Sequence, residues 1–288
     1  MISLVGASPA PPVRPAVRVT VGQITSTDDH EANRSTAAEV LRAAAAAHAD
    51  LLVLPEYTAA FHPAGTGPAL AEPLDGPFVT TLRELAATTG VAVIAGTAVP
   101  GTAVPGTAAP GSAARAVNVV VAVDGRGDLV GTYRKVHLYD AFGTRESDRL
   151  EPGPADAPPL VLDVQGLRLG VMTCYDLRFP ESARRLVDAG AQVLVVPAAW
   201  ASGPLKVAHW TTLATARAIE NAAAVVAVGQ AGRGVIGHSL VIAPDGVIAL
   251  ELDNTPAMRT VDLNPPDLAA VRERNPSLSN RRYRVVPA

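Results

Sequence analysis

Three residues whose side chains suit nucleophilic catalysis each lie at or just beyond the end of an apolar stretch. Cys174, the only cysteine, lies in VMTCYDLRFPE, Glu56 lies in LVLPEY, and Lys135 lies in TYRKVHLYD. A thiolate attacks carbonyl carbons, a glutamate can take up the thiol proton, and a lysine ammonium can stabilise the charge that develops on a carbonyl oxygen. A lone cysteine is more often an inert core residue. This chemistry therefore requires the three stretches to meet in space.

The two charged residues also have simpler explanations. For Glu56 the alternative is a helix-capping acid in a loop, but its place after Leu-Pro at the end of a buried strand favours a function. For Lys135 the alternative is a solvated surface lysine. However, Lys135 and Lys206 are the only lysines in a chain with 24 lysines and arginines together. Lysine supplies a compact charge whose pKa shifts readily on burial, so its presence in such a chain favours a functional role.

The segments that precede these residues predict the strands that position them. Residues 167–173 form an apolar run typical of a buried strand. Residues 180–190 begin with proline and glutamate and end with glycine, which predicts a helix. Cys174 is therefore predicted on a bend between a strand and a helix. Residues 50–55 predict a short buried strand that ends directly before Glu56.

The rest of the chain mixes strand–helix units with hairpins. This mixture predicts an α+β fold in which two mixed sheets pack together with helices outside, a four-layer α-β-β-α sandwich. The predicted helices are 28–49, 77–89, 180–190 and 207–221. The predicted strands are 16–24, 50–55, 91–97, 117–123, 129–133, 160–164, 167–173, 192–197, 222–228, 239–243 and 247–252.

The composition restricts the function classes. The chain has 288 residues, of which 48% are hydrophobic, enough for one large core. A net charge of -3 without a basic block argues against nucleic-acid binding. No apolar run is long enough to span a membrane, and no signal peptide is recognisable. A single cysteine suits the reducing cytoplasm. We expect a cytoplasmic protein with a flexible tail at 1–15 and a single domain at 16–288.

The sequence contains no convincing metal or cofactor motif. Residues 232–237 spell GxGxxG, but residues 239–243 predict a strand where a dinucleotide site needs a helix. The six histidines lack metal-ligand spacing. His137 and His209 are most simply structural or pocket-lining residues, and Cys174 lacks the local signature of papain-like proteases. We expect neither a metal nor an organic cofactor.

Residues 97–111 consist of three pentapeptides, TAVPG, TAVPG and TAAPG. Each unit contains a proline–glycine turn signal. Three units are too few for a solenoid, so we expect an extended surface loop between two strands. A second interpretation is a lid over a pocket, which would alter the size of the substrate.

Taken in order, the stretches around Glu56, Lys135 and Cys174 resemble the nitrilase superfamily of carbon–nitrogen hydrolases. The resemblance extends from about residue 18 to residue 284. It includes PAAW at 197–200, and also the stretches at 209–221 and 237–246. The combination in this order is specific, whereas each piece alone is weak.

The resemblance implies a Glu-Lys-Cys triad. Cys174 would be the nucleophile and Glu56 the general base. Lys135 would stabilise the oxyanion together with the backbone N–H of Tyr175. Glu146 matches a second family glutamate that would orient Lys135 or the substrate amine. Glu151 lies nearby, but the motif alignment favours Glu146; the alternative for Glu146 is a loop acid on the surface.

CYDLRFPE resembles the amidase branch that includes omega-amidase and deaminated glutathione amidase. The resemblance implies hydrolysis of a small linear carboxamide to an acid and ammonia through a thioester, and at least a homodimer. Arg178 would hold a substrate carboxylate or pair with Glu181. Trp200 would line the pocket or fill the core. The alternatives are an N-carbamoyl or nitrile hydrolase with the same triad, or a non-catalytic scaffold.

Overall fold

The computed structural model describes residues 16–101 and 115–287, which form two six-stranded sheets with helices outside them. The first sheet consists of β14 (Ala257–Leu263), β1 (Val17–Gln23), β2 (Leu51–Val53), β3 (Ala92–Pro100), β4 (Ala116–Val123) and β5 (Leu129–Arg134), in that order. The second sheet consists of β13 (Ile248–Glu251), β12 (Leu240–Ile242), β11 (Ala224–Gly229), β10 (Val193–Ala198), β9 (Leu167–Val171) and β8 (Val161–Val164). The α-helices are α1 (His30–Ala46), α2 (Pro77–Thr89), α3 (Pro180–Asp188), α4 (Lys206–Asn221) and α5 (Pro265–Arg274).

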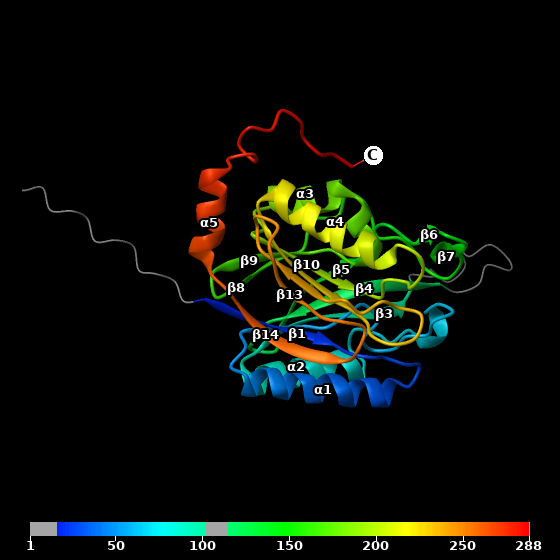
Figure 1. The fold of residues 1–288 in the computed structure, drawn as a ribbon. Helices are drawn as coiled ribbons and strands as arrows, with labels where there is room; N and C mark the ends of the chain where they lie inside the picture. The colour runs from blue at the N-terminus through cyan, green and yellow to red at the C-terminus, as the bar shows by residue number, and fades with distance from the viewer. Residues whose placement is uncertain (1–15, 102–114, 288) are drawn as a thin grey trace, which may run out of the picture.

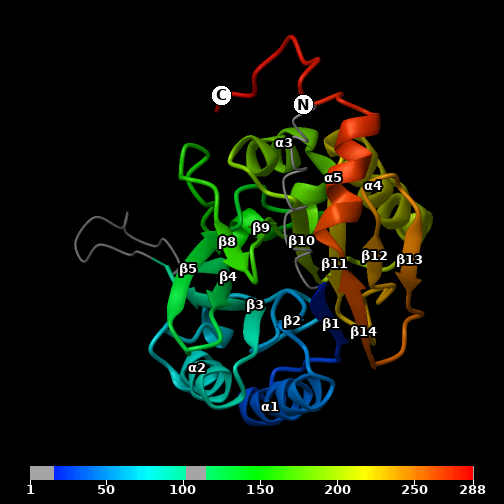
Figure 2. The same ribbon diagram turned by 90° about the vertical axis from the view of Figure 1, so that its left-hand side faces the viewer.

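The sheets and helices form four layers (Figure 1). Helices α1 and α2 cover the outer face of the first sheet, and α3 and α4 cover the outer face of the second. Figure 2 shows the same layers from the side, with α5 along one edge. The predicted α-β-β-α arrangement is therefore the observed one.

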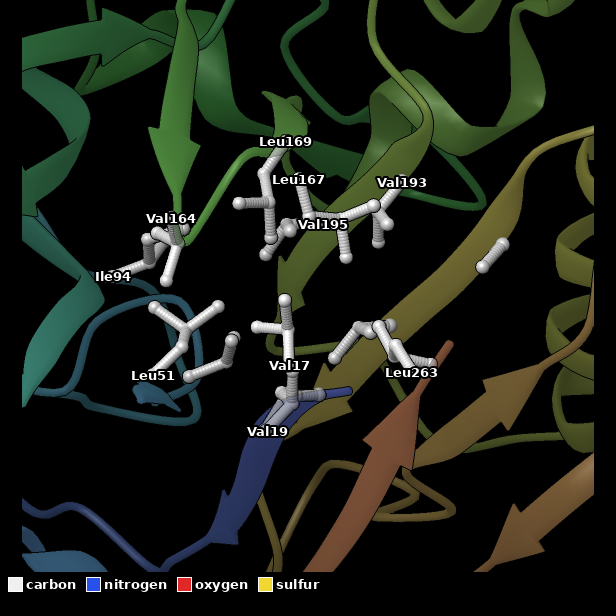
Figure 3. Packing of buried hydrophobic residues seen from close by; sticks show 14 of the residues in the cluster. Val17, Val19, Leu51, Ile94, Val164, Leu167, Leu169, Val193, Val195 and Leu263 are labelled. Atoms are coloured by element: carbon white, nitrogen blue, oxygen red, sulfur yellow. The ribbon is translucent and has the colours of Figure 1, made fainter. Parts of the chain in front are cut away.

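Apolar side chains fill the space between the two sheets (Figure 3). Val17 and Leu51 of the first sheet face Leu169 and Val195 of the second, and all four are fully buried. Burying apolar surface contributes about 25 cal/mol per Å², so this layer fixes how the sheets sit on each other. The strand ends that carry the site are thereby held in place.

The two sheets share one pattern of strand pairing. In the first, β1, β2 and β3 are parallel, and β4 and β5 continue antiparallel. In the second, β9, β10 and β11 are parallel, and β12 and β13 continue antiparallel. An antiparallel strand, β14 or β8, completes each sheet beside its first strand. The chain thus builds the same half twice.

Local sequence signals explain where several helices begin and end. The Asp29 side chain accepts a hydrogen bond from the Ala32 N–H and caps α1. Helix α2 begins at Pro77, and Gly90 adopts the left-handed conformation after its last turn. Pro180 likewise begins α3, and Glu181 lies in its first turn.

The three predicted hairpins are confirmed as β4–β5, β8–β9 and β12–β13. Strand β14, helix α5 and the short β6–β7 hairpin (Asp140–Ala141 and Thr144–Arg145) were not predicted. Strand β3 continues to Pro100, so the predicted loop at 97–111 begins with strand residues. Residues 102–114 of that loop and the predicted tail at 1–15 lie outside the described residues. The GxGxxG stretch at 232–237 leads to β12 and not to a helix.

No helix within residues 16–101 and 115–287 is both long and apolar enough to cross a bilayer.

Candidate active site

A cavity of about 250 Å³ lies where strand ends of both sheets meet. Its wall includes Glu56, Glu146 and Cys174. The ammonium of Lys135 contacts both of these glutamates. The structure therefore brings together all four residues predicted to be catalytic. The other predicted site residues, Tyr175, Arg178 and Trp200, line the same cavity.

Glu56 follows β2 and is only 1% exposed. Its Oε1 accepts hydrogen bonds from Lys135 Nζ at 2.9 Å and from Asn118 Nδ2 at 2.6 Å. Its Oε2 accepts one from the backbone N–H of Ala199 at 2.7 Å. The Glu56 backbone lies against Gly96 of β3, where an added Cβ would stand 2.4 Å from the Glu56 Cα. Glu56 is thus a rigidly held carboxylate and not an exposed helix cap.

Lys135 directly follows β5 and is also 1% exposed. Besides Glu56, its Nζ donates to Glu146 Oε2 at 2.9 Å and Oε1 at 3.1 Å. Burial alone would lower the pKa of Lys135, but the charges of Glu146 and Glu56 outweigh burial and raise this pKa well above 10.5. The lysine is a fixed cation and not a solvated surface residue.

Glu146 begins the short 3₁₀ helix η2 (Glu146–Asp148) after the β6–β7 hairpin. Its Oε2 also accepts the backbone N–H of Tyr139 at 2.7 Å, and its Oε1 accepts the Tyr57 hydroxyl at 3.3 Å. Glu151, the competing acid, lies 3.7 Å from Arg134 instead. Of Glu146 and Glu151, it is therefore Glu146 that contacts the buried lysine.

Cys174 begins the 3₁₀ helix η3 (Cys174–Arg178), between β9 and α3, as the bend prediction requires. Its φ of 47° lies in the left-handed region, which is unfavourable for a residue with a Cβ. Burial and the nearby negative charge of Glu56 raise the pKa of the thiol well above 9.0, against the opposing effect of Lys135. A side-chain hydrogen bond to Glu56 adds to the increase. The thiol therefore rests protonated beside a carboxylate.

Two cations without a carboxylate partner among the described residues line the cavity opposite this cluster of acids. Arg178 forms no ion pair with Glu181. Its guanidinium lies 4.8 Å from the Trp200 ring centre and 3.4 Å from His209 Nδ1, and its buried Nε has no hydrogen-bond partner. Lys206 donates from Nζ to the Tyr139 hydroxyl at 2.7 Å. Burial, with a smaller effect of Arg178, lowers the pKa of Lys206. Both side chains are placed to receive a negative group.

Trp200 has both roles that the sequence left open. Its ring is 4% exposed and packs 5.2 Å from the Trp210 ring, yet it lines the cavity. Its Nε1 donates to the backbone carbonyl of Lys206 at 3.0 Å. Tyr175 follows Cys174 in the first turn of η3, where backbone N–H groups have no partner within the helix.

Sequence reasoning missed several residues of this site. Asn118 and Tyr139 gave no signal, because each contacts the site through an atom that only the fold places there. Lys206 stood out as one of two lysines, but its position gave no hint of its partner. His137 is hydrogen-bonded to Asp176, in accord with the structural role expected for it. No group of three His, Cys, Asp or Glu side chains within 16–101 and 115–287 could hold a metal ion.

A model of the carbon–nitrogen hydrolase family matches residues 18–273. The chain therefore belongs to the carbon–nitrogen hydrolase family, a class of enzymes that act on non-peptide carbon–nitrogen bonds. Among its relatives is deaminated glutathione amidase of Escherichia coli O157:H7, which is 39% identical over 267 residues, 92% of this chain and 97% of that protein.

Solved structures agree with this family assignment. A CN-hydrolase superfamily protein of Xanthomonas campestris, with an arsenic adduct in its active site, gives a TM-score of 0.80 at 27% identity over 94% of this chain and 99% of that one. A mutant amidase of Nesterenkonia sp. AN1, with the acetamide moiety of fluoroacetamide added at its active-site cysteine, gives 0.73 at 26% identity over 96% and 100%. The predicted nitrilase-superfamily membership and sandwich fold are confirmed.

Proposed function

We propose that this chain is an amidase that hydrolyses a small linear carboxamide to a carboxylic acid and ammonia, with Cys174 as nucleophile. One observation carries the proposal: Glu56, which is buried and paired with Lys135 at 2.9 Å, stands beside the Cys174 thiol, and Glu56 and Cys174 line the same cavity. A scaffold without catalysis gains nothing from two buried charges next to a thiol, because burying charge is costly. The fluoroacetamide adduct on the cysteine of the Nesterenkonia amidase supports the same choice of nucleophile.

The first half of the reaction forms a thioester. Glu56 takes the proton of the Cys174 thiol as the sulfur attacks the carbonyl carbon. Lys135 and the backbone N–H of Tyr175 stabilise the oxyanion. The carbon–nitrogen bond then breaks, and the departing nitrogen takes the proton from Glu56 and leaves as ammonia. A raised thiol pKa suits this scheme, because the proton is removed only as attack occurs.

The second half releases the acid. A water molecule gives its proton to Glu56 and attacks the thioester carbonyl, and the sulfur leaves and is reprotonated. Glu146 keeps Lys135 in place through both of its oxygens, so the ammonium stays directed at the oxyanion. Each turnover consumes one amide and one water, and needs neither metal nor organic cofactor in this scheme.

The substrate is inferred to carry a carboxylate. Arg178 and Lys206 line the cavity without acidic partners, and the absence of an Arg178–Glu181 pair favours a role in binding over a role in scaffolding. The cavity volume of about 250 Å³ lies just below the usual range for ligand pockets, which suits a small molecule. Deaminated glutathione, named for the Escherichia coli relative, is one amide to test beside shorter omega-amides.

The experiment combines turnover with intact-protein mass spectrometry. Purified protein is offered omega-amides, deaminated glutathione, N-carbamoyl amino acids and nitriles. Ammonia release is measured for all of them except deaminated glutathione, whose hydrolysis is followed by release of the amine fragment. We expect turnover of carboxylate-bearing amides and a covalent acyl adduct, both absent in Cys174→Ala. Turnover of only carbamoyl compounds or nitriles would replace the amide assignment. No turnover and no adduct with any of them would leave the scaffold explanation.

We further propose that residues 16–288 act as one domain and that the enzyme is a cytoplasmic homodimer or a larger homo-oligomer. Both sheets contribute to one apolar layer, which supports the single domain. Exposed apolar side chains at Leu205 and Ile219, 69% and 49% exposed at the two ends of α4, support self-association. Sedimentation velocity at micromolar concentration tests this, and a single monomer peak would contradict it.

A further inference from the structure

Two residues after Cys174, the carboxylate of Asp176 is completely buried and has no part in the proposed reaction. Its Oδ2 accepts hydrogen bonds from the backbone N–H of Thr173 at 3.0 Å and from the hydroxyl of Tyr133 at 2.8 Å. Its Oδ1 accepts the backbone N–H of His137 at 3.1 Å and lies 2.7 Å from that residue's Nδ1. Four contacts therefore compensate this buried charge.

One of these contacts, together with a backbone hydrogen bond, closes the turn that carries the thiol. The carboxylate of Asp176 accepts the N–H of Thr173, and the N–H of Asp176 donates to the Thr173 carbonyl at 3.0 Å. Cys174 lies inside this closed turn with its φ of 47°. An unfavourable backbone conformation persists only where surrounding contacts hold it. The Asp176 carboxylate supplies such a contact.

The other contacts reach the opposite sheet. Tyr133 lies on β5 and His137 lies just beyond it, two residues on each side of Lys135. The His137 ring also stacks on Phe179, which precedes α3, with centroids 3.7 Å apart. A single side chain thus joins the turn of the proposed nucleophile, in the second half, to the strand end that carries the proposed oxyanion-stabilising lysine, in the first.

We propose that Asp176 is a positioning residue that holds the Cys174 turn in register with Lys135 across the two sheets. This inference rests on the proposed function for its effect on turnover. The geometry also explains why the side chain is an acid. Each carboxylate oxygen accepts a backbone N–H, one from Thr173 and one from His137. An asparagine amide, in either orientation, would turn its NH₂ group toward one of these donors.

The test compares Asp176→Asn with Val195→Ala, a substitution in the apolar layer far from polar partners. We expect kcat of Asp176→Asn to fall about 100-fold, because a small misplacement of reacting groups can slow a reaction by about that factor. KM should change by less than about threefold. Val195→Ala should lower the melting temperature but leave kcat close to wild type. The two variants are compared under conditions in which they are equally stable. The proposal would be overturned if Asp176→Asn then lowered kcat no more than Val195→Ala does.

A second set of variants covers the case in which Asp176→Asn fails to fold. Tyr133→Phe removes one donor, and we expect kcat to fall about 2- to 10-fold. His137→Leu should act similarly, whereas His137→Asn, which places an amide NH₂ near the position of Nδ1, should recover most of the lost kcat. Equal kcat in the leucine and asparagine variants would contradict a hydrogen-bonding role for this side chain.

Alkylation of Cys174 by iodoacetamide separates this inference from the proposed function, because it needs no substrate. Burial raises the pKa of the wild-type thiol, so a loosened turn in Asp176→Asn should move the pKa of the alkylation profile down toward 9.0. An unchanged profile would count against Asp176 even in an inactive enzyme. A shifted profile with no wild-type turnover of any amide would keep the positioning role and reject the amidase assignment.

Discussion

The two halves of the molecule share a strand pattern but differ in the polar groups at their strand ends. The first half supplies Glu56 after β2 and Lys135 after β5, both buried and fully engaged in hydrogen bonds and ion pairs. The second half supplies Cys174 after β9, and Arg178 and Lys206, which have no acidic partner. The first half therefore presents a complete charge network. The two cations of the second half contact no carboxylate among the described residues: Lys206 donates to the Tyr139 hydroxyl, and Arg178 lies 3.4 Å from His209 Nδ1.

This difference matches two separate tasks. A general base and an oxyanion donor work best when they are preorganised, because no reorganisation is then needed during the reaction. Groups that bind a substrate must keep some hydrogen-bonding capacity free, as the unpartnered Nε of Arg178 does. The duplicated fold has thus placed the proposed proton transfer in its first half and the proposed recognition in its second.

The largest expected effect comes from breaking the first half at Glu56. Glu56→Gln removes the proposed base and turns an NH₂ group toward either Ala199 N–H or the Lys135 ammonium. We expect kcat to fall by at least about 10³-fold, measured as ammonia release from an omega-amide. Glu39→Gln, at an exposed position of α1, is the matched control and should keep wild-type activity. Activity of Glu56→Gln within tenfold of wild type would remove Glu56 from the mechanism.

The same substitution at the two lysines tests the comparison directly. Lys135→Met leaves Glu56 and Glu146 buried next to each other without a cation, and should lower the free energy of unfolding by about 3–5 kcal/mol. Lys206→Met removes a buried cation whose ammonium donates to the Tyr139 hydroxyl and not to a carboxylate, and should change that free energy by less than about 1 kcal/mol. Urea denaturation at pH 7 measures both. Similar losses in the two variants would abolish the distinction between the halves.

Recognition by the second half is tested with paired substrates. Arg178→Met should raise KM about 10- to 100-fold for a carboxylate-bearing amide, as expected for loss of a hydrogen bond to a charged group. The KM for a neutral amide of equal length should change little. Arg126→Met, at a side chain that is 80% exposed, serves as the control. An equal rise in KM for both amides would indicate a general distortion of the cavity in place of carboxylate binding.

Local patterns predicted much of the fold and part of the site. The apolar strand before Cys174 and the proline-led helix after it predicted that Cys174 lies on a bend, because both signals lie within about ten residues of it. Strand β14 was missed because it is an edge strand with mixed burial and weak alternation. Helix α5 was missed because only Leu268 of its residues is buried, so it lacks an apolar stripe.

The contacts within the site could not be derived from spacing. Glu56 and Lys135 are separated by 79 residues, and only the resemblance to a family predicted their meeting. Asp176, Lys206 and Tyr139 were not assigned roles, because their partners lie on other segments and no local pattern encodes such contacts. Long-range polar contacts follow from the packing of the sheets, which sequence periodicity does not determine.

The smallest expected effect concerns the contact between the halves, where the Cys174 thiol faces the Glu56 carboxylate. The pKa of the Cys174 thiol is raised in the folded protein, so above pH 9.0 the unfolded chain loses a proton that the folded chain keeps. The unfolded state is then favoured, and wild-type stability should fall between pH 9 and 10 by about 1 kcal/mol per group at most. In Cys174→Ala this decrease should be smaller, leaving the part due to Lys135 and to three tyrosines with raised pKa values, Tyr57, Tyr133 and Tyr139. Urea denaturation of both proteins from pH 7 to 10.5 measures the difference; identical alkaline slopes would mean that the thiol is not held neutral against the carboxylate.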